Sequence, residues 1–184
     1  MSRARAAAVE LARMLRTLVL VVAAAALGLA ALGAVPAWLA SDLEAHKVPG
    51  LPEAERQLAA RIDIPAYFPE RLRWPPAEVW VAGGRRGTAL LVFDDAGGRP
   101  AVQLLQALRA GDELYPELVG RPEVLGTRDV TLGGLRARLS ELRLYGAPWR
   151  ELAWELDGRP YRLRSCGPQE ELERMAESLS GRTR

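Results

Sequence analysis

The feature that most constrains this chain of 184 residues is an uncharged stretch near its N-terminus. No charged residue occurs between Arg16 and Asp42, and the apolar run is about as long as the roughly 20 residues that a helix needs to cross a bilayer. We therefore predict a transmembrane signal anchor from Thr17 to Ala40. The alternative is a cleaved signal peptide, with Val35 and Ala37 as the small residues before the cut. The anchor is favoured because the run is too long for a typical signal-peptide core.

Three residues of this run suggest how the predicted helix contacts the membrane or another helix. Trp38 falls near the outer end, where an indole can bury its ring and keep its N–H hydrated, although an ordinary apolar contact explains it equally well. Gly28 and Gly33 permit close approach of another membrane helix, or simply reflect an alanine-rich span. The lipid bilayer is thus the first expected partner, and a membrane or envelope protein is the second.

The charge of the chain divides at the apolar run. Residues 1–16 carry four arginines and one glutamate, a net charge of +3, which keeps this end in the cytoplasm and places the C-terminal part outside. The rest of the chain has 21 basic and 22 acidic residues, a net charge of −1, so it offers no electrostatic surface for nucleic acid. We expect an inner-membrane protein with a periplasmic or extracellular domain.

For the sequence after the apolar run, we predict a linker over residues 41–52 and a folded domain over residues 53–184. A short helix is expected at 53–61, where Pro65 and Pro69 prevent its continuation. Alternating apolar and polar residues then predict strands at 78–82, 88–94, 101–108, 128–132, 135–144, 151–156 and 161–164. The expected fold is α+β: the N-terminal transmembrane helix, then a curved antiparallel sheet of about six or seven strands with a C-terminal helix packed on it.

Two tight turns fix the register of the predicted hairpins. If Asp157 and Gly158 form a two-residue turn, three pairs of residues face each other: Trp154 and Tyr161, Leu152 and Leu163, and Glu151 and Arg164. If Gly133 and Gly134 form the other turn, the facing pairs are Leu132 and Leu135, Val130 and Ala137, and Asp129 and Arg138. Both registers agree with alternation between an inner and an outer face.

The C-terminal segment predicts an amphipathic helix that begins at Pro168 and ends before Gly181. Its apolar residues recur at helical spacing: Leu172, Met175, Ala176 and Leu179. This stripe is expected to cover the sheet, and a partner-binding helix is the alternative.

The inventory of reactive residues argues against an enzyme. The single histidine, His46, falls in the predicted linker, and Cys166 is expected to fill a strand-to-helix corner, although a helix N-terminus could activate its thiol. The pairs Asp94–Asp95 and Glu170–Glu171 are typical of turns and helix starts. We predict no catalytic residues, no cofactor and no metal site, and an envelope enzyme using carboxylates or Cys166 stays as a minor alternative.

Four arginines on predicted strands can form a basic strip on one sheet face, open to an anionic ligand: Arg136, Arg138, Arg162 and Arg164. Three acids lie beside them and favour a mixed, solvated face instead: Asp129, Glu151 and Glu155.

The C-terminal segment is similar to the closing part of a domain found outside the membrane in anchored anti-sigma factors and sporulation-associated lipoproteins. The shared pattern is a tryptophan strand, a tight turn, a Tyr-x-Leu strand and an acidic helix, here represented by Trp154, Gly158, Tyr161, Leu163, Glu171, Leu172, Met175, Ala176, Glu177, Ser178 and Leu179. Residues 62–70 resemble the Pro-x-x-x-Pro entry of that domain, so the resemblance covers about residues 60–180.

The resemblance implies a curved antiparallel sheet, distantly like lipoprotein carriers, that binds or senses rather than catalyses. Residues 1–16 are too short for a sigma-binding domain, and no cysteine follows the apolar run to accept a lipid, so a strict anti-sigma factor is not expected. We therefore predict a membrane-anchored binding or sensory module, with an accessory subunit of a membrane complex as the alternative. Four aromatic residues could line a ligand cavity or simply fill the core: Trp80, Phe93, Trp154 and Tyr161.

Overall fold

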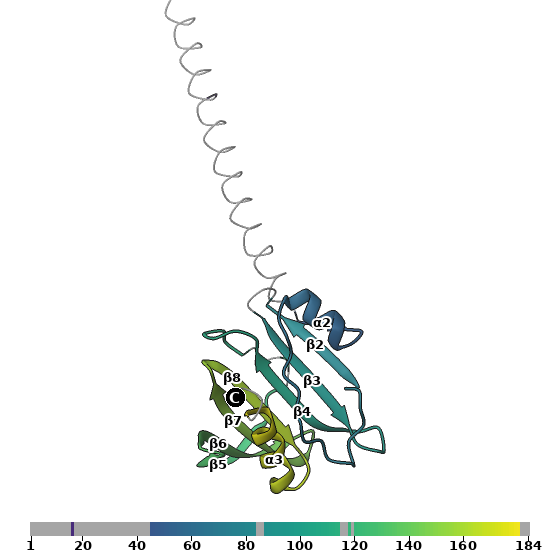
Figure 1. The fold of residues 1–184 in the computed structure, drawn as a ribbon. Helices are drawn as coiled ribbons and strands as arrows, with labels where there is room; N and C mark the ends of the chain where they lie inside the picture. Colours follow the sequence, from purple (N-terminus) through teal and green to yellow (C-terminus); the bar gives the residue numbers. More distant parts are fainter. Residues whose placement is uncertain (1–15, 17–44, 84–86, 115–117, 119, 181–184) are drawn as a thin grey trace, which may run out of the picture. The chain divides into compact units, whose positions relative to one another are not determined.

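One antiparallel sheet accounts for most of the structure, a computed structural model that describes residue 16 and residues 45–83, 87–114, 118 and 120–180. Apart from Arg16, these residues belong to one compact unit, Leu43–Arg184, and only this unit is described below. Its eight strands lie in the order β1-β2-β3-β4-β8-β7-β6-β5 (Figure 1). Their bounds are β1 His46–Val48, β2 Glu78–Ala82, β3 Thr88–Asp94, β4 Pro100–Ala107, β5 Glu123–Leu132, β6 Leu135–Leu144, β7 Ala147–Leu156 and β8 Arg159–Ser165.

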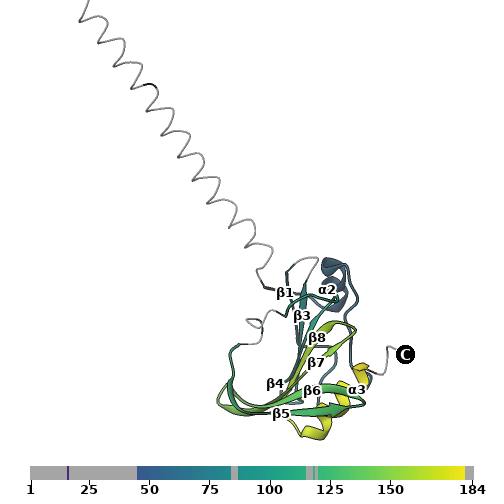
Figure 2. The same ribbon diagram turned by 90° about the vertical axis from the view of Figure 1, so that its left-hand side faces the viewer.

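Two short helices, α2 (Leu51–Leu58) and α3 (Gln169–Ser180), pack on the same face of the sheet. Ala54 and Leu58 of α2 and the predicted stripe of α3 are buried in one apolar cluster with Leu91, Leu104 and Leu163 of the sheet. We call this side of the sheet the covered face. Figure 2 shows the sheet curving away from both helices, so that the opposite side is concave.

Both predicted hairpin registers are confirmed. Trp154 faces Tyr161 and Glu151 faces Arg164 across the turn at Asp157–Gly158. Val130 faces Ala137 and Asp129 faces Arg138 across the turn at Gly133–Gly134. Positive φ angles at all four turn residues explain why glycine occupies three of these positions.

The predicted α+β class is wrong, because the described chain is largely β, with eight strands and only two short helices. The missing strand is β1, which pairs with β2 through His46, Lys47 and Val48. This short edge strand lacks the alternating pattern on which the strand predictions relied. It also corrects the predicted linker, since residues 46–48 form β1 and α2 begins at Leu51.

The predicted transmembrane helix cannot be placed in this fold. Its residues, Thr17, Gly28, Gly33, Trp38 and Ala40 among them, lie outside the described part of the chain. Within the part that is described, no helix combines the length and the apolar character needed to span a bilayer.

Candidate functional site

An open groove of about 980 Å³ lies on the concave side of the sheet, opposite the helices. Strands β5 to β8 form its floor and one wall, and residues 112–114, which follow β4, form the other wall. We call this side of the sheet the groove face. Charged side chains of both signs line the groove: Arg136, Arg138, Arg162, Asp112, Glu113, Asp129 and Glu155.

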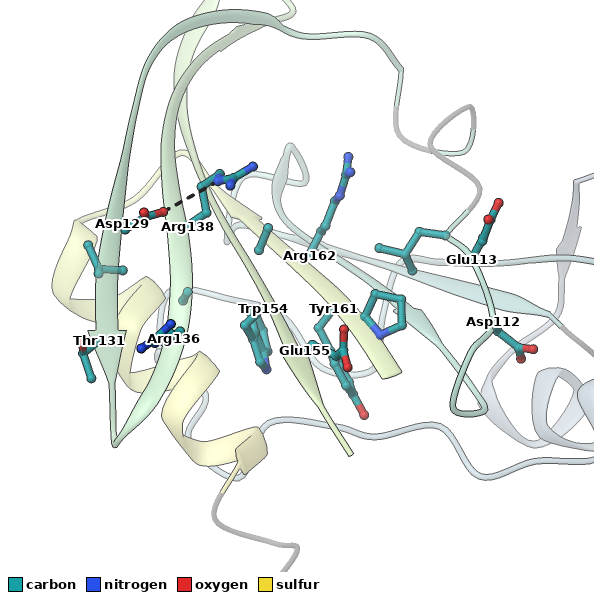
Figure 3. Close-up of a pocket in the computed structure, with 15 residues that line it drawn as sticks. Asp112, Glu113, Asp129, Thr131, Arg136, Arg138, Trp154, Glu155, Tyr161 and Arg162 are labelled. Carbon is teal, nitrogen blue, oxygen red and sulfur yellow. Dashed lines mark ion pairs between the residues drawn. The ribbon is translucent and has the colours of Figure 1, made fainter. Parts of the chain in front are cut away.

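The strand register brings Arg138, Ala153 and Arg162 into one row across β6, β7 and β8. Residues that face each other on neighbouring strands project from the same face of a sheet. Both arginines therefore stand on the groove face, with only a methyl group between them. Figure 3 shows the two arginine side chains rising from the same side of the sheet.

Acidic groups border these arginines. Asp129 pairs with Arg138 at 3.8 Å, but both side chains are largely exposed, so the pair contributes little to stability. Glu113 rises from the opposite wall of the groove (Figure 3), and Glu155 lies on β7, where it faces Pro160 of β8. The mixed, solvated face that the sequence favours over a purely basic strip is confirmed for the groove.

The fourth arginine of the predicted strip has a different environment. Arg164 is 3% exposed, and its Nε donates a hydrogen bond to Oε2 of Glu151 at 2.5 Å. Ser140 continues the row on β6 and lies 3.2 Å from the Thr127 hydroxyl of β5. The charges of Arg164 and Glu151 are therefore paired within the protein, although they lie next to the row of Arg138 and Arg162.

The four aromatic residues that the sequence suggested as ligand-lining are divided between the two faces. Phe93, Trp154 and Tyr161 belong to the apolar cluster of the covered face. Trp154 and Tyr161 stack at 5.3 Å between ring centroids and point away from the groove, although they border its floor (Figure 3). Trp80 lies on the other side of the sheet, half-buried against Leu90, Val92 and Leu105. The four residues do not form one cavity.

The hydroxyl group of Tyr161 lies in a polar cluster at the border of the apolar core. This hydroxyl donates a hydrogen bond to Oδ2 of Asp63 at 2.6 Å, and Arg159 pairs with the same oxygen at 2.8 Å. Gln106 is fully buried and exchanges two hydrogen bonds with the backbone of Asp63. Burial, followed by the hydrogen bond to Asp63, raises the pKa of the Tyr161 hydroxyl above its ordinary value.

The remaining reactive candidates lie apart from the groove. Cys166 follows β8 as a free, exposed thiol, which corrects the expectation that it fills a strand-to-helix corner. His46 is exposed on β1, where its Nε2 lies 2.9 Å from Oε1 of Gln57. Asp95 accepts the backbone N–H of Arg99 in a turn, and this hydrogen bond lowers the pKa of its carboxyl. Within the described ranges, no three His, Cys, Asp or Glu side chains are grouped so that they could hold a metal ion.

Sequence reasoning found the arginines of the groove but missed its second wall. Residues 112–114 follow a strand without any motif, and nothing in their spacing indicates that Glu113 and Leu114 approach β8. A smaller apolar pocket of about 350 Å³ was also missed, and it is lined by Ile64, Pro65, Phe68 and Trp74.

Comparisons of the chain with family models, with curated proteins and with solved structures find no match. The resemblance to the extracytoplasmic domain of anchored anti-sigma factors therefore stays a prediction that rests on the quoted residues.

Proposed function

We propose that this chain is a membrane-attached binding module that acts outside the cytoplasm, without catalysis, and takes its ligand in the groove on the concave side of the sheet. The observation that carries the proposal is the groove itself. Its volume of about 980 Å³ is in the range of small-molecule sites, and its lining combines charged side chains of both signs with apolar surface. The N-terminal charge asymmetry of the sequence supports the location outside the cytoplasm.

The distribution of reactive residues supports binding rather than catalysis. The one histidine of the chain, His46, lies on β1, at the opposite edge of the sheet from β5. The one cysteine, Cys166, follows the end of β8 and does not line the groove. An imidazole base or a thiol nucleophile would have to come from these two residues, so neither serves the groove.

Native mass spectrometry of the full chain, extracted from membranes in detergent, tests this proposal. The wild-type protein is expected to carry an additional bound mass. Ala153→Trp, which fills the floor of the groove, should lose that mass, whereas Ala96→Trp, in an exposed turn outside the groove, should retain it. The proposal fails if repeated wild-type preparations carry no ligand or if Ala153→Trp retains the bound mass.

A second candidate function is that of an accessory subunit of a membrane complex. Exposed apolar side chains near the edge strand β5 support it. Val124 and Leu125 at the start of β5 are 60% and 51% exposed, and Tyr145, after β6, is 73% exposed. β5 is the last strand of the sheet, and a long edge strand is a common site of strand addition by a partner. Affinity purification from membranes should then recover a stoichiometric partner that Val124→Lys removes and Glu155→Lys, on the groove face, does not.

A further inference from the structure

Two neighbouring rows on the groove face cross the same three strands, and only one of them has a carboxylate on the central strand, β7. In the first row, Glu151 on β7 stands between Ser140 and Arg164 and neutralises the arginine. In the second row, Ala153 on β7 stands between Arg138 and Arg162. The second row thus has two guanidinium groups and no carboxylate at the position where the first row has one.

The second row also has room for a carboxylate from outside. Cβ atoms of facing residues lie about 5 Å apart, so those of Arg138 and Arg162 are separated by about 10 Å, with the alanine methyl between them. Among the described residues, no Asp or Glu lies within ion-pair distance of Arg162, and Arg138 has only the long, exposed contact with Asp129. Figure 3 shows both side chains extending from the floor into the groove.

Apart from Arg136, the other charged residues that line the groove are acidic. Glu113 on the far wall and Glu155 on β7 both line it, and each is exposed. These carboxylates would repel a ligand that is negative throughout, but they would attract an amino group. The charge pattern of the groove therefore fits a molecule that carries a negative group and a positive group.

We infer that the groove binds a zwitterion of the amino acid or short-peptide class. The ligand's carboxylate lies above Ala153 between Arg138 and Arg162, in the role that Glu151 has beside Arg164. Its amino group faces Glu113 and Glu155. The inference rests on the proposed function, because it names the ligand class of the same groove.

Binding can be followed through the backbone amide resonances of β7 and β8 by NMR of the full chain in detergent micelles. The probes are triglycine, triglycine amide, N-acetyl-triglycine, glycine and inorganic phosphate. Triglycine is expected to shift the resonances around Ala153 and Arg162, and the amide, which lacks the carboxylate, should bind at least tenfold more weakly. N-acetylation should also weaken binding, by a smaller factor. Glycine separates a site for single amino acids from one that needs a peptide.

Substitutions test the position of the carboxylate. Ala153→Glu places an internal carboxylate where the ligand's would lie, so triglycine binding should be lost, while Ala153→Gln, of the same size but uncharged, should weaken it less because it leaves both guanidinium groups without a carboxylate. Arg162→Gln should weaken binding at least tenfold. Arg143→Gln, on the same strand as Arg138 but outside the groove, should leave it unchanged. The dispersion of each spectrum shows whether the variant is folded.

Three results would overturn the inference: phosphate binding as tightly as triglycine, Ala153→Glu binding triglycine like the wild type, or no shift with any probe. None of them affects the native mass spectrometry result. A bound mass that Ala153→Trp removes would then support the groove as a binding site for a different class of ligand.

Discussion

The two faces of the sheet are made by the same strands, yet their side chains differ sharply across β6, β7 and β8. On the covered face, one row across β3, β4, β8, β7 and β6 consists entirely of leucine: Leu91, Leu104, Leu163, Leu152 and Leu139. On the groove face, the adjacent row on the same strands begins with Val92 and is otherwise polar: Gln103, Arg164, Glu151 and Ser140. A shift of one residue along β4, β8, β7 and β6 therefore separates an apolar core from a row of buried polar side chains.

This contrast shows that strand register determines the core and the groove together. Because side chains alternate between faces, a slip of one residue in β8 would bring Arg162 and Arg164 into the core and expose Leu163. The tight turns at Gly133–Gly134 and Asp157–Gly158, with positive φ angles, hold the register of both hairpins. The turn residues therefore matter for the groove, although they do not contact a ligand.

The largest expected effect on stability comes from the groove face, where one ion pair is as buried as the core. Glu151→Ala should lower the free energy of unfolding by about 4 kcal/mol, since it leaves the Arg164 guanidinium buried without its carboxylate. Urea denaturation of the full chain measures this loss. The double variant Glu151→Leu with Arg164→Leu should recover most of the stability, because it removes both charges. A loss below about 1 kcal/mol in Glu151→Ala would show that the pair is not desolvated.

The next prediction compares the loss of stability on truncating two consecutive residues of β8 that lie on opposite faces of the sheet. Leu163 is fully buried on the covered face, so Leu163→Ala should cost about 3 kcal/mol through lost apolar contacts and the cavity it leaves. Arg162→Ala, on the groove face, should change stability by about 0.5 kcal/mol or less. The same denaturation experiment compares the two variants. Equal losses would mean that the groove face contributes to the core.

The features that depend on side-chain alternation and on turn geometry were predicted correctly from the sequence. The register around Trp154 and Tyr161 followed from one two-residue turn, and the helix stripe of Leu172 and Met175 followed from its spacing. The bounds of β2, β3 and β6 were predicted to the residue. These features are determined by residues close together in the chain, so a local sequence pattern is enough to predict them.

The missed features depend on distant contacts or on short elements. β1 has three residues, and only its pairing with β2 makes it a strand. Glu113 reaches the groove because the chain after β4 folds back over β8, which no local pattern encodes. The sequence left both roles open for the aromatic candidates, because a large, buried aromatic ring has the same sequence signal whether it lines a cavity or fills a core.

The smallest effect concerns the one phenol that joins the covered face to a polar cluster. Tyr161→Phe removes the hydrogen bond to the Asp63 carboxylate and should cost about 2 kcal/mol at neutral pH. The pKa of Tyr161 is raised above its ordinary value near 10, so the folded state keeps this proton after the unfolded state has lost it. Stability is therefore full below pH 10 and should fall above it, by about 1.4 kcal/mol per pH unit.

Unfolding titrations between pH 8 and pH 11 test this slope, with Tyr145→Phe as the matched control because Tyr145 is 73% exposed. The control should keep both the neutral-pH stability and the alkaline slope of the wild type. Tyr161→Phe should begin lower but lose the part of the slope that this proton causes, so the two curves should converge as the pH rises. Parallel curves for Tyr161→Phe and the wild type would mean that the phenol titrates normally, and that the covered face is open to solvent at the Asp63 cluster.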